Sequence, residues 1–238
     1  MLTHSTTAVL VAAATVSLAM TPPNFAPAST TDLFVNFNGI AALNGAVVAK
    51  ATTAKQPTVG TADQLPGSSY ALIMVDLDIP TNNPPATSTL LHWLQTGLTP
   101  ATSATSITST TGGAQKFFML QPPGDPTAAY ASYIAPNPPA RVPLSHRYTQ
   151  ILVDTSAATT AELNALKKAA ANRSGFSASA VLAQANLVNK VVAGNWFVVT
   201  NPGPAINSNV AGSGTESTAN NISSDASFQH RHWHWHWH

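Results

Sequence analysis

Residues 69–80 read Ser-Tyr-Ala-Leu-Ile-Met-Val-Asp-Leu-Asp-Ile-Pro. The continuous apolar run from Tyr70 to Val75 is typical of a strand buried inside a sheet. Two carboxylates follow directly, and Pro80 restricts the backbone where the chain turns. Because a carboxylate at a strand exit can face a pocket, the stretch predicts a central strand with a polar site at its end.

Other segments predict a mainly-β fold whose helices come late in the chain. Runs rich in β-branched and aromatic residues indicate strands at 33–36, 46–49, 91–94, 147–153, 191–193 and 196–199. Thr159 and Glu162 have the spacing of a capping box for a helix over 161–171. Ser177 can cap a second helix over 178–186.

Loops are expected where breakers and small polar residues gather. The Thr- and Ser-rich stretch 96–113 reads as a surface loop or insertion, and proline clusters at 79–85, 122–126 and 136–143 read as fixed loops. With these connections, the strands and late helices predict an antiparallel β-sandwich with appended C-terminal helices.

Composition removes several classes of function. The chain has 238 residues, only 8% of them charged, and a formal net charge of +1, whereas about 25% is usual for charged residues. Without a basic patch there is no electrostatic case for nucleic acid or for a polybasic membrane anchor. The absence of cysteine excludes disulfides, thiol catalysis, cysteine zinc sites and iron–sulfur clusters.

The N-terminus predicts export. Thr7 to Ala19 is an apolar run with small residues at the cleavage positions before Met20. Prolines 22 and 23 end this run before the roughly 20 residues that a membrane-spanning helix needs. We therefore expect a signal peptide, a secreted protein and no transmembrane anchor. A buried N-terminal helix is the alternative, and Ala26-Pro27-Ala28 offers a second cleavage site.

The C-terminus differs in composition from the rest. Residues 201–229 contain almost no large apolar side chain, so we expect them to be disordered. Alternating histidines and tryptophans follow, with chelating imidazoles at His230, His232, His234, His236 and His238. A natural metal-binding tail and an engineered affinity tag both fit this pattern, and we favour the tag.

These features divide the chain into five parts: signal peptide 1–19, N-terminal segment 20–31, domain 32–200, disordered polar tail 201–229 and tag-like tail 230–238. Two sequons, at Asn172 and Asn221, are candidates for glycosylation if the host is eukaryotic. Low charge and the lack of a large apolar run favour a monomer.

Three places gather groups that can carry chemistry. They are Asp76 and Asp78 with Pro80, then His92-Trp93, then the run from Pro138 and Pro139 to Ser145-His146-Arg147-Tyr148. Each has a structural alternative, because an aspartate can cap a turn, a tryptophan can belong to the core, and Arg147 can pair with one of the aspartates.

In their order and spacing, these motifs resemble the phosphatidylethanolamine-binding protein family, also called the Raf-kinase-inhibitor-protein family, and its secreted fungal members in particular. The resemblance covers residues 32–200 and rests on segments 70–80, 91–94, 133–139, 146–148, 176–186 and 192–197. It implies the family's sandwich and a small anion pocket at one end, lined by Asp76, His92, Pro138, Pro139, His146 and Tyr148. Asp78, Pro80 and Trp93 complete the candidate ligand-binding set.

The chain also departs from the family's pattern. Leu77 stands where the family has its middle proline, and Leu90 stands where many members have a pocket tryptophan. Ala135 and Asn137 replace glycines beside the pocket, and the stretch from Pro139 to His146 is about one residue longer. These changes put the shape and selectivity of the pocket in question.

The resemblance implies a binding protein for phospholipid head groups or other small phosphorylated ligands, such as phosphoethanolamine. An imidazole can become a cationic donor toward phosphate, so binding is expected to tighten as the pH falls toward 6. The alternative is a protein-interaction role, including inhibition of a serine carboxypeptidase, as in some fungal relatives.

We expect no enzyme activity, no cofactor and no metal in the domain. Ser145 and His146 are adjacent, so on a strand they point to opposite faces and cannot act as nucleophile and base. Residues 175–179 begin like a nucleophile elbow but lack its final glycine.

Overall fold

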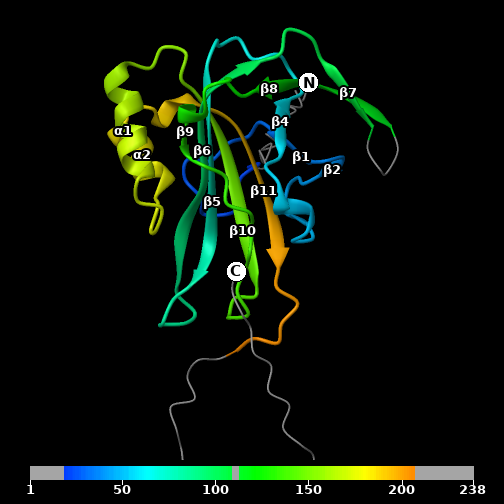
Figure 1. The fold of residues 1–238 in the computed structure, drawn as a ribbon, viewed down its shortest axis with the longest axis vertical. Coiled ribbons are helices and arrows are strands. Elements are labelled where there is room, and N and C mark those ends of the chain that lie inside the picture. Colours follow the sequence, from blue (N-terminus) through cyan, green and yellow to red (C-terminus); the bar gives the residue numbers. More distant parts are fainter. Residues whose placement is uncertain (1–18, 109–112, 207–238) are drawn as a thin grey trace, which may run out of the picture. The chain divides into compact units, whose positions relative to one another are not determined.

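The computed structural model describes residues 19–108 and 113–206 (Figure 1). Several predictions fall outside the described residues: the signal peptide before Ala19, the sequon at Asn221, and the tail from residue 207 onward with its alternating histidines. No helix in the described part of the chain is long and apolar enough to cross a membrane.

The chain is built mainly of strands. They are β1 (Phe34–Phe37), β2 (Ile40–Ala41), β3 (Ala46–Val47), β4 (Thr58–Thr61), β5 (Tyr70–Pro80), β6 (Thr87–Pro100), β7 (Thr105–Thr108), β8 (Ala114–Gln121), β9 (Ala129–Ala131), β10 (Ser145–Asp154) and β11 (Val191–Thr200). The α-helices are α1 (Thr160–Ala170) and α2 (Ala178–Gln184), and short 3-10 turns are η1 (Thr52–Ala54), η2 (Pro126–Ala128) and η3 (Val188–Lys190).

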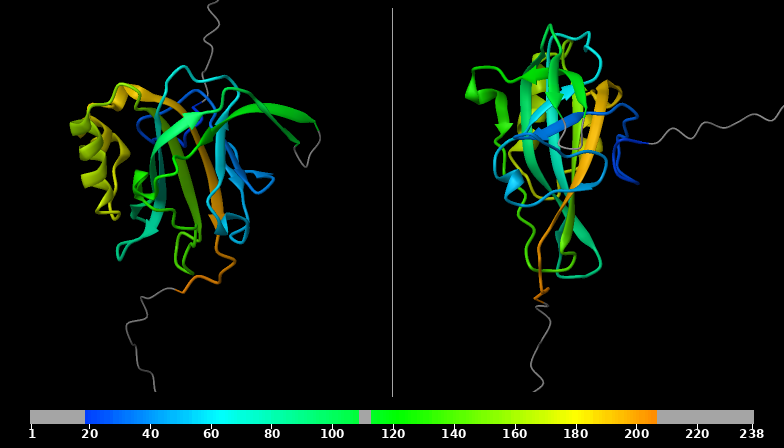
Figure 2. Two further views of the ribbon diagram at one scale, coloured as in Figure 1. Left: turned by 45° about the horizontal axis from the view of Figure 1, so that its top comes forward. Right: turned by 90° about the vertical axis from the view of Figure 1, so that its right-hand side faces the viewer.

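The strands form one curled sheet in the order β2-β1-β4-β8-β6-β5-β10-β11-β3, with β7 paired to β8 and β9 to β6. Most neighbours are antiparallel, but β3 runs parallel to β11. Figure 2 shows α1 and α2 together on one side of the sheet. The predicted mainly-β fold with helices near the C-terminus is confirmed, with one parallel pair that the sequence did not indicate.

Strand β5 lies between two cores, which explains its unbroken apolar run. Tyr70, Leu72 and Met74 face the inner core, which is enclosed by the curl of the sheet. The alternate side chains, such as Ile73 and Val75, face the helix-side core under α1 and α2. The prediction of a buried central strand is therefore correct.

The helices begin at the predicted caps. The Thr159 hydroxyl accepts a hydrogen bond from the backbone N–H of Glu162, and the Glu162 carboxylate accepts one from the backbone N–H of Thr159. The Ser177 hydroxyl caps α2 by accepting from Ala180 N–H. Helix α2 ends two residues earlier than predicted, and Asn186 then adopts a φ of +56°, which a helix cannot contain.

The stretch 96–113, predicted as a loop, is largely strand in its described residues. Strand β6 continues to Pro100, and β7 pairs with β8, which the sequence analysis missed. Threonine favours strands because of its branched Cβ, and this preference outweighed the loop-like composition. The rings of Phe117 in β8 and Phe34 in β1 stack at 3.8 Å between centroids.

Residues 20–29 form a loop, here called the hook, that lies on the domain beside β11 (Figure 2). Met20 N–H donates to the Ser29 carbonyl (2.6 Å) and closes it. Thr21 and Ser29 are buried against Gly194, where a Cβ would lie only 2.7 Å from the Thr21 methyl carbon. Glycine is therefore required in β11 for this close approach.

The prediction of disorder for residues 201–229 was wrong for the first six of them, which the structure describes as an ordered segment beyond β11. Asn201 N–H donates to the Leu144 carbonyl (2.8 Å), and Ile206 N–H donates to the Ala140 carbonyl (2.6 Å). Residues 201–206, here called the strap, are therefore hydrogen-bonded along loop 138–144. These backbone hydrogen bonds hold the strap in place, although its polar sequence buries little apolar surface.

Candidate functional site

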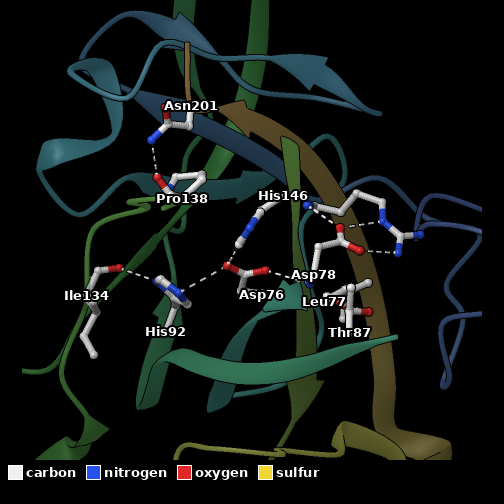
Figure 3. A network of polar contacts seen from close by, with 10 residues as sticks. Asp76, Leu77, Asp78, Thr87, His92, Ile134, Pro138, His146 and Asn201 are labelled. Carbon is white, nitrogen blue, oxygen red and sulfur yellow. Dashed lines mark hydrogen bonds and ion pairs between the residues drawn. The ribbon is translucent and has the colours of Figure 1, made fainter. Parts of the chain in front are cut away.

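Three neighbouring strands bring four of the predicted polar residues together at one end of the inner core. Figure 3 shows three of them, Asp76, His92 and His146. Tyr148 of β10 lies directly opposite Asp76 of β5 in the strand pairing. His146 is two residues away on the same face of β10. His92 of β6 reaches the same Asp76 carboxylate. Asp76, His92, His146 and Tyr148 are called the polar cluster below.

A β-bulge in β6 aims His92 into this cluster. Leu91 and Trp93 oppose successive residues of β5, so His92 is an extra residue in the pairing. Such a bulge re-aims a side chain, and it turns both His92 and Trp93 toward the inner core. The His92 ring meets the Tyr148 ring edge-on at 5.1 Å between centroids. Trp93 packs edge-on against Tyr133 at 5.9 Å.

The Asp76 carboxylate organises the cluster. Its Oδ2 accepts a hydrogen bond from His146 Nδ1 (2.8 Å) and lies 3.8 Å from His92 Nε2. Its Oδ1 accepts from the backbone N–H of Asp78 (2.9 Å). On its other nitrogen, His92 Nδ1 donates to the Ile134 carbonyl (2.7 Å). Each histidine therefore has its Nδ1 proton engaged, and in the neutral form its Nε2 carries a lone pair.

Two polar atoms of the cluster are buried and have no hydrogen-bond partner among the described residues: His146 Nε2 and the Tyr148 hydroxyl. Both side chains are fully buried. The Asp76 carboxylate and the backbone of Asn137 are polar neighbours of the hydroxyl, but neither has hydrogen-bond geometry with it. Burial and the Asp76 charge raise the pKa of Tyr148, so the hydroxyl remains a donor at neutral pH.

Burial also decides the charge on His92. Its removal from water lowers the pKa of His92 below the ordinary value, and the Ile134 carbonyl and Asp76 carboxylate offset this effect only in part. At neutral pH, His92 is therefore uncharged. A protonated His92 would place an N–H beside the Asp76 carboxylate and any anion bound there.

The second aspartate has a structural partner. The Asp78 carboxylate accepts three hydrogen bonds from Arg147, from its backbone N–H (2.8 Å), Nε (2.8 Å) and Nη2 (2.7 Å). Burial works against ionisation, but these bonds outweigh it and lower the pKa of Asp78. Its carboxylate is thus not free for a ligand, in contrast to its predicted place in the candidate set. Pro80 ends β5 opposite Thr87 and contributes no polar group.

The remaining predicted residues surround the cluster unequally. Trp93 belongs to the inner core, and its Nε1 is buried without a partner. Pro138 is buried, and its carbonyl accepts from the Asn201 side chain of the strap (2.8 Å), while Pro139 is exposed. Figure 3 shows Pro138 and Asn201 above His92 and His146. Sequence reasoning missed Asn201 and the Ile134 carbonyl, because neither contact follows from a recognisable motif.

The departures from the family's pattern fall in different places. Leu77 lies on the helix-side face of β5 and packs against that core. Leu90 pairs with Asp76 across β5 and β6 and forms a bridge to Ser174. Ala135 is partly buried and Asn137 is exposed in the loop before Pro138. Within residues 19–108 and 113–206, no three His, Cys, Asp or Glu side chains are grouped to hold a metal ion.

The family model described as "Phosphatidylethanolamine-binding protein" matches residues 35–197, more than half of the chain. The chain belongs to this family. The suspected resemblance is therefore confirmed, and the polar cluster lies within the matched region. Among curated proteins, none matches the chain.

Several solved structures are similar to the chain at low identity. A phosphatidylethanolamine-binding protein from Plasmodium vivax is 19% identical over 75% of this chain and 91% of that chain, with a TM-score of 0.47. One from Plasmodium falciparum is 22% identical over 75% and 91%, also with 0.47. A carboxypeptidase Y inhibitor complexed with its cognate proteinase is 17% identical over 73% and 84%, with 0.48.

Proposed function

We propose that the polar cluster binds the anionic head group of a small phosphorylated ligand, such as phosphoethanolamine, in a secreted, non-catalytic protein. One observation carries the proposal: His146 Nε2 and the Tyr148 hydroxyl are buried side by side in the cluster and have no hydrogen-bond partner. Burying such groups costs about 1–3 kcal/mol each, a cost that is typical of functional sites.

The chemistry of the cluster suits an anion that brings or acquires a proton. The Tyr148 hydroxyl donates to a phosphoryl oxygen. His146 Nε2 accepts from a P–OH group or, once protonated, donates to the anion. Since Asp76 already holds a negative charge beside both histidines, proton uptake is required to bind a dianion favourably. Binding should therefore take up protons and tighten as the pH falls toward 6.

The polar cluster contains no serine, threonine, cysteine or lysine that its histidines could activate as a nucleophile, which favours binding over catalysis. The neighbouring hydroxyl of Ser145 is hydrogen-bonded to Thr200 (2.8 Å) and, by strand alternation, points away from His146. The Asp76–His146 pair has the arrangement that orients a general base, but hydrolysis by the serine-hydrolase route also needs an activated serine or cysteine within reach of that base.

A titration with phosphoethanolamine tests the proposal. We expect saturable NMR shifts at the His92 and His146 imidazoles, lost in His146→Ala and retained in the matched control Ser145→Ala. Calorimetry in two buffers of different ionisation enthalpy should show proton uptake. Inorganic phosphate and ethanolamine, titrated separately, show which half of the ligand is recognised. Affinity that is flat from pH 5 to 8, or shifts unaffected by His146→Ala, would contradict the proposal.

The alternative, a protein-interaction or serine carboxypeptidase-inhibitor role, makes a different forecast. Inhibition of a purified serine carboxypeptidase by the mature protein, lost on trimming the chain to Asp32, would support it. Binding of the head group without inhibition would support the proposal above.

A further inference from the structure

A cavity of about 410 Å³ lies on the opposite side of the sheet from the polar cluster. It is lined by Val75 and Leu77 of β5, Thr89 of β6 and Arg147 of β10, and its walls are residues 23–26 of the hook and residues 176–179 at the start of α2. We propose that this cavity binds a monocarboxylate with a short apolar tail, such as a medium-chain fatty acid, independently of the head-group site.

The lining suits an apolar tail. Val75 and Leu77 form the floor, and Phe25 and Phe176 stand on opposite walls. All four belong to the helix-side core or pack against it, so an apolar tail in the cavity would extend a hydrophobic surface that the fold already builds. The volume falls within the range of about 300–1,000 Å³ that is usual for small-molecule sites.

Among the described residues, Arg147 is the only charged side chain that lines this cavity. Its guanidinium has five N–H groups, and two of them bind the Asp78 carboxylate. Among the described residues, the side chain makes no other hydrogen bond, and it is 39% exposed. Three of its N–H groups therefore have no partner in the described part of the chain. Because Asp78 already balances the single charge of the guanidinium, a ligand is held here by hydrogen bonds, and a singly charged carboxylate is repelled less by Asp78 than a dianionic phosphate would be.

Two serines supply one further donor. The Ser177 and Ser179 hydroxyls bond to each other (3.2 Å), and this contact uses one of their two hydroxyl hydrogens. Ser177 Oγ also accepts a hydrogen bond from the backbone N–H of Ala180, so this oxygen is already satisfied as an acceptor. The other hydroxyl hydrogen is free for a ligand oxygen. The third hydroxyl, that of Thr89, donates to the Phe176 carbonyl (2.9 Å) and is engaged.

The cavity thus combines an apolar body with donors and no acidic lining residue, which is the complement of an apolar carboxylate. The hook contributes only uncharged residues here, Pro23 to Ala26. The polar cluster has the reverse character, since its centre is the Asp76 carboxylate. The two sites should therefore differ in the ligands they select.

The test is a titration of the ¹⁵N-labelled full chain with octanoate, monitored by NMR. Octylamine has the same tail with the opposite charge, and acetate has the same head group without the tail. We expect saturable shifts around Leu77 and residues 177–180, with octanoate at least about ten-fold tighter than either control, as a charge-assisted hydrogen bond implies.

Two variants separate this cavity from the polar cluster. Ser179→Phe fills the cavity from a partly exposed position and should abolish octanoate binding, and the milder Ser179→Ala should weaken it a few-fold. His146→Ala should leave octanoate binding unchanged. N-acetyl-leucine as a third probe distinguishes a fatty acid from a peptide C-terminus, and tighter binding of N-acetyl-leucine than of octanoate would overturn the assignment to a fatty acid.

Three other results would overturn the proposal. They are shifts centred on His92 and His146, octylamine binding as tightly as octanoate, or full octanoate affinity in both Ser179 variants when their spectra remain folded. Failure of phosphoethanolamine to bind has no bearing on this result, because this cavity and the polar cluster lie on opposite faces of the sheet.

Discussion

Tyr148→Phe should stabilise the free protein and weaken its binding of anions. The Tyr148 ring is fully buried and packs against Phe197 at 5.5 Å and against His92 at 5.1 Å between centroids. Phenylalanine keeps these contacts. The substitution removes only the hydroxyl, which has no hydrogen-bond partner in the structure.

The two effects can be estimated separately. A buried hydroxyl without a partner costs about 1–3 kcal/mol, so its removal should raise the free energy of unfolding by about 1–2 kcal/mol. For a domain of this size, that corresponds to roughly 2–8 °C in Tm. A hydrogen bond to a charged ligand contributes about 1.5–3 kcal/mol, so affinity for phosphoethanolamine should fall about 10- to 100-fold.

Urea unfolding and calorimetric titration measure the two effects, and Tyr133→Phe is the matched control. The Tyr133 hydroxyl donates to the Thr53 carbonyl (2.7 Å). Its loss should destabilise the protein by about 1 kcal/mol and leave anion binding unchanged. The two tyrosine variants should therefore shift stability in opposite directions.

A loss of 1 kcal/mol or more of stability in Tyr148→Phe would contradict the predicted stabilisation, since the hydroxyl would then be hydrogen-bonded in the free protein. Unchanged affinity for phosphoethanolamine in this variant would refute the role of the hydroxyl in binding.

Three further predictions concern pH, the buried ion pair and the hook. Burial lowers the pKa of His92 in the folded state, so as the pH falls the unfolded chain takes up a proton at this residue before the folded protein does. The urea midpoint should therefore fall as the pH drops below about 6.5 toward the folded-state pKa. This pH dependence should be absent in His92→Phe. Arg147→Met should cost about 2 kcal/mol of unfolding free energy at pH 7, allowing for the partial exposure of the guanidinium. This cost should shrink as the pH falls through the lowered pKa of Asp78. The double variant Arg147→Met, Asp78→Asn should be more stable than Arg147→Met alone, because no unpaired carboxylate remains. If the chain is exported as we propose, the intact mass of the mature protein should show Met20 as its first residue, because cleavage after Ala28 would remove Thr21 from its buried contact with Gly194. A chain beginning at Ser29 would contradict this prediction.

Local patterns predicted much of the fold. The apolar run of β5 and the caps at Thr159 and Ser177 depend on residues near one another in the chain, and the structure has them as predicted. Strands β7 and β8 were missed because their Thr-, Gln- and Lys-containing sequences acquire strand structure from pairing with each other. The same holds for the strap, whose hydrogen bonds to loop 138–144 join residues about 60 positions apart.

For the candidate site, residue types and motif order were enough to single out Asp76, His92, His146 and Tyr148. Which aspartate stays available depended on tertiary structure, because Arg147 lies beside Asp78 only when β10 pairs with β5. The direction of His92 depended on a bulge, which is a mismatch between two strands and leaves no mark in either one alone. The cavity beside Arg147 likewise exists only where the hook, the sheet and α2 meet. Side-chain chemistry is local to the sequence, but burial and partner choice arise from contacts between distant segments.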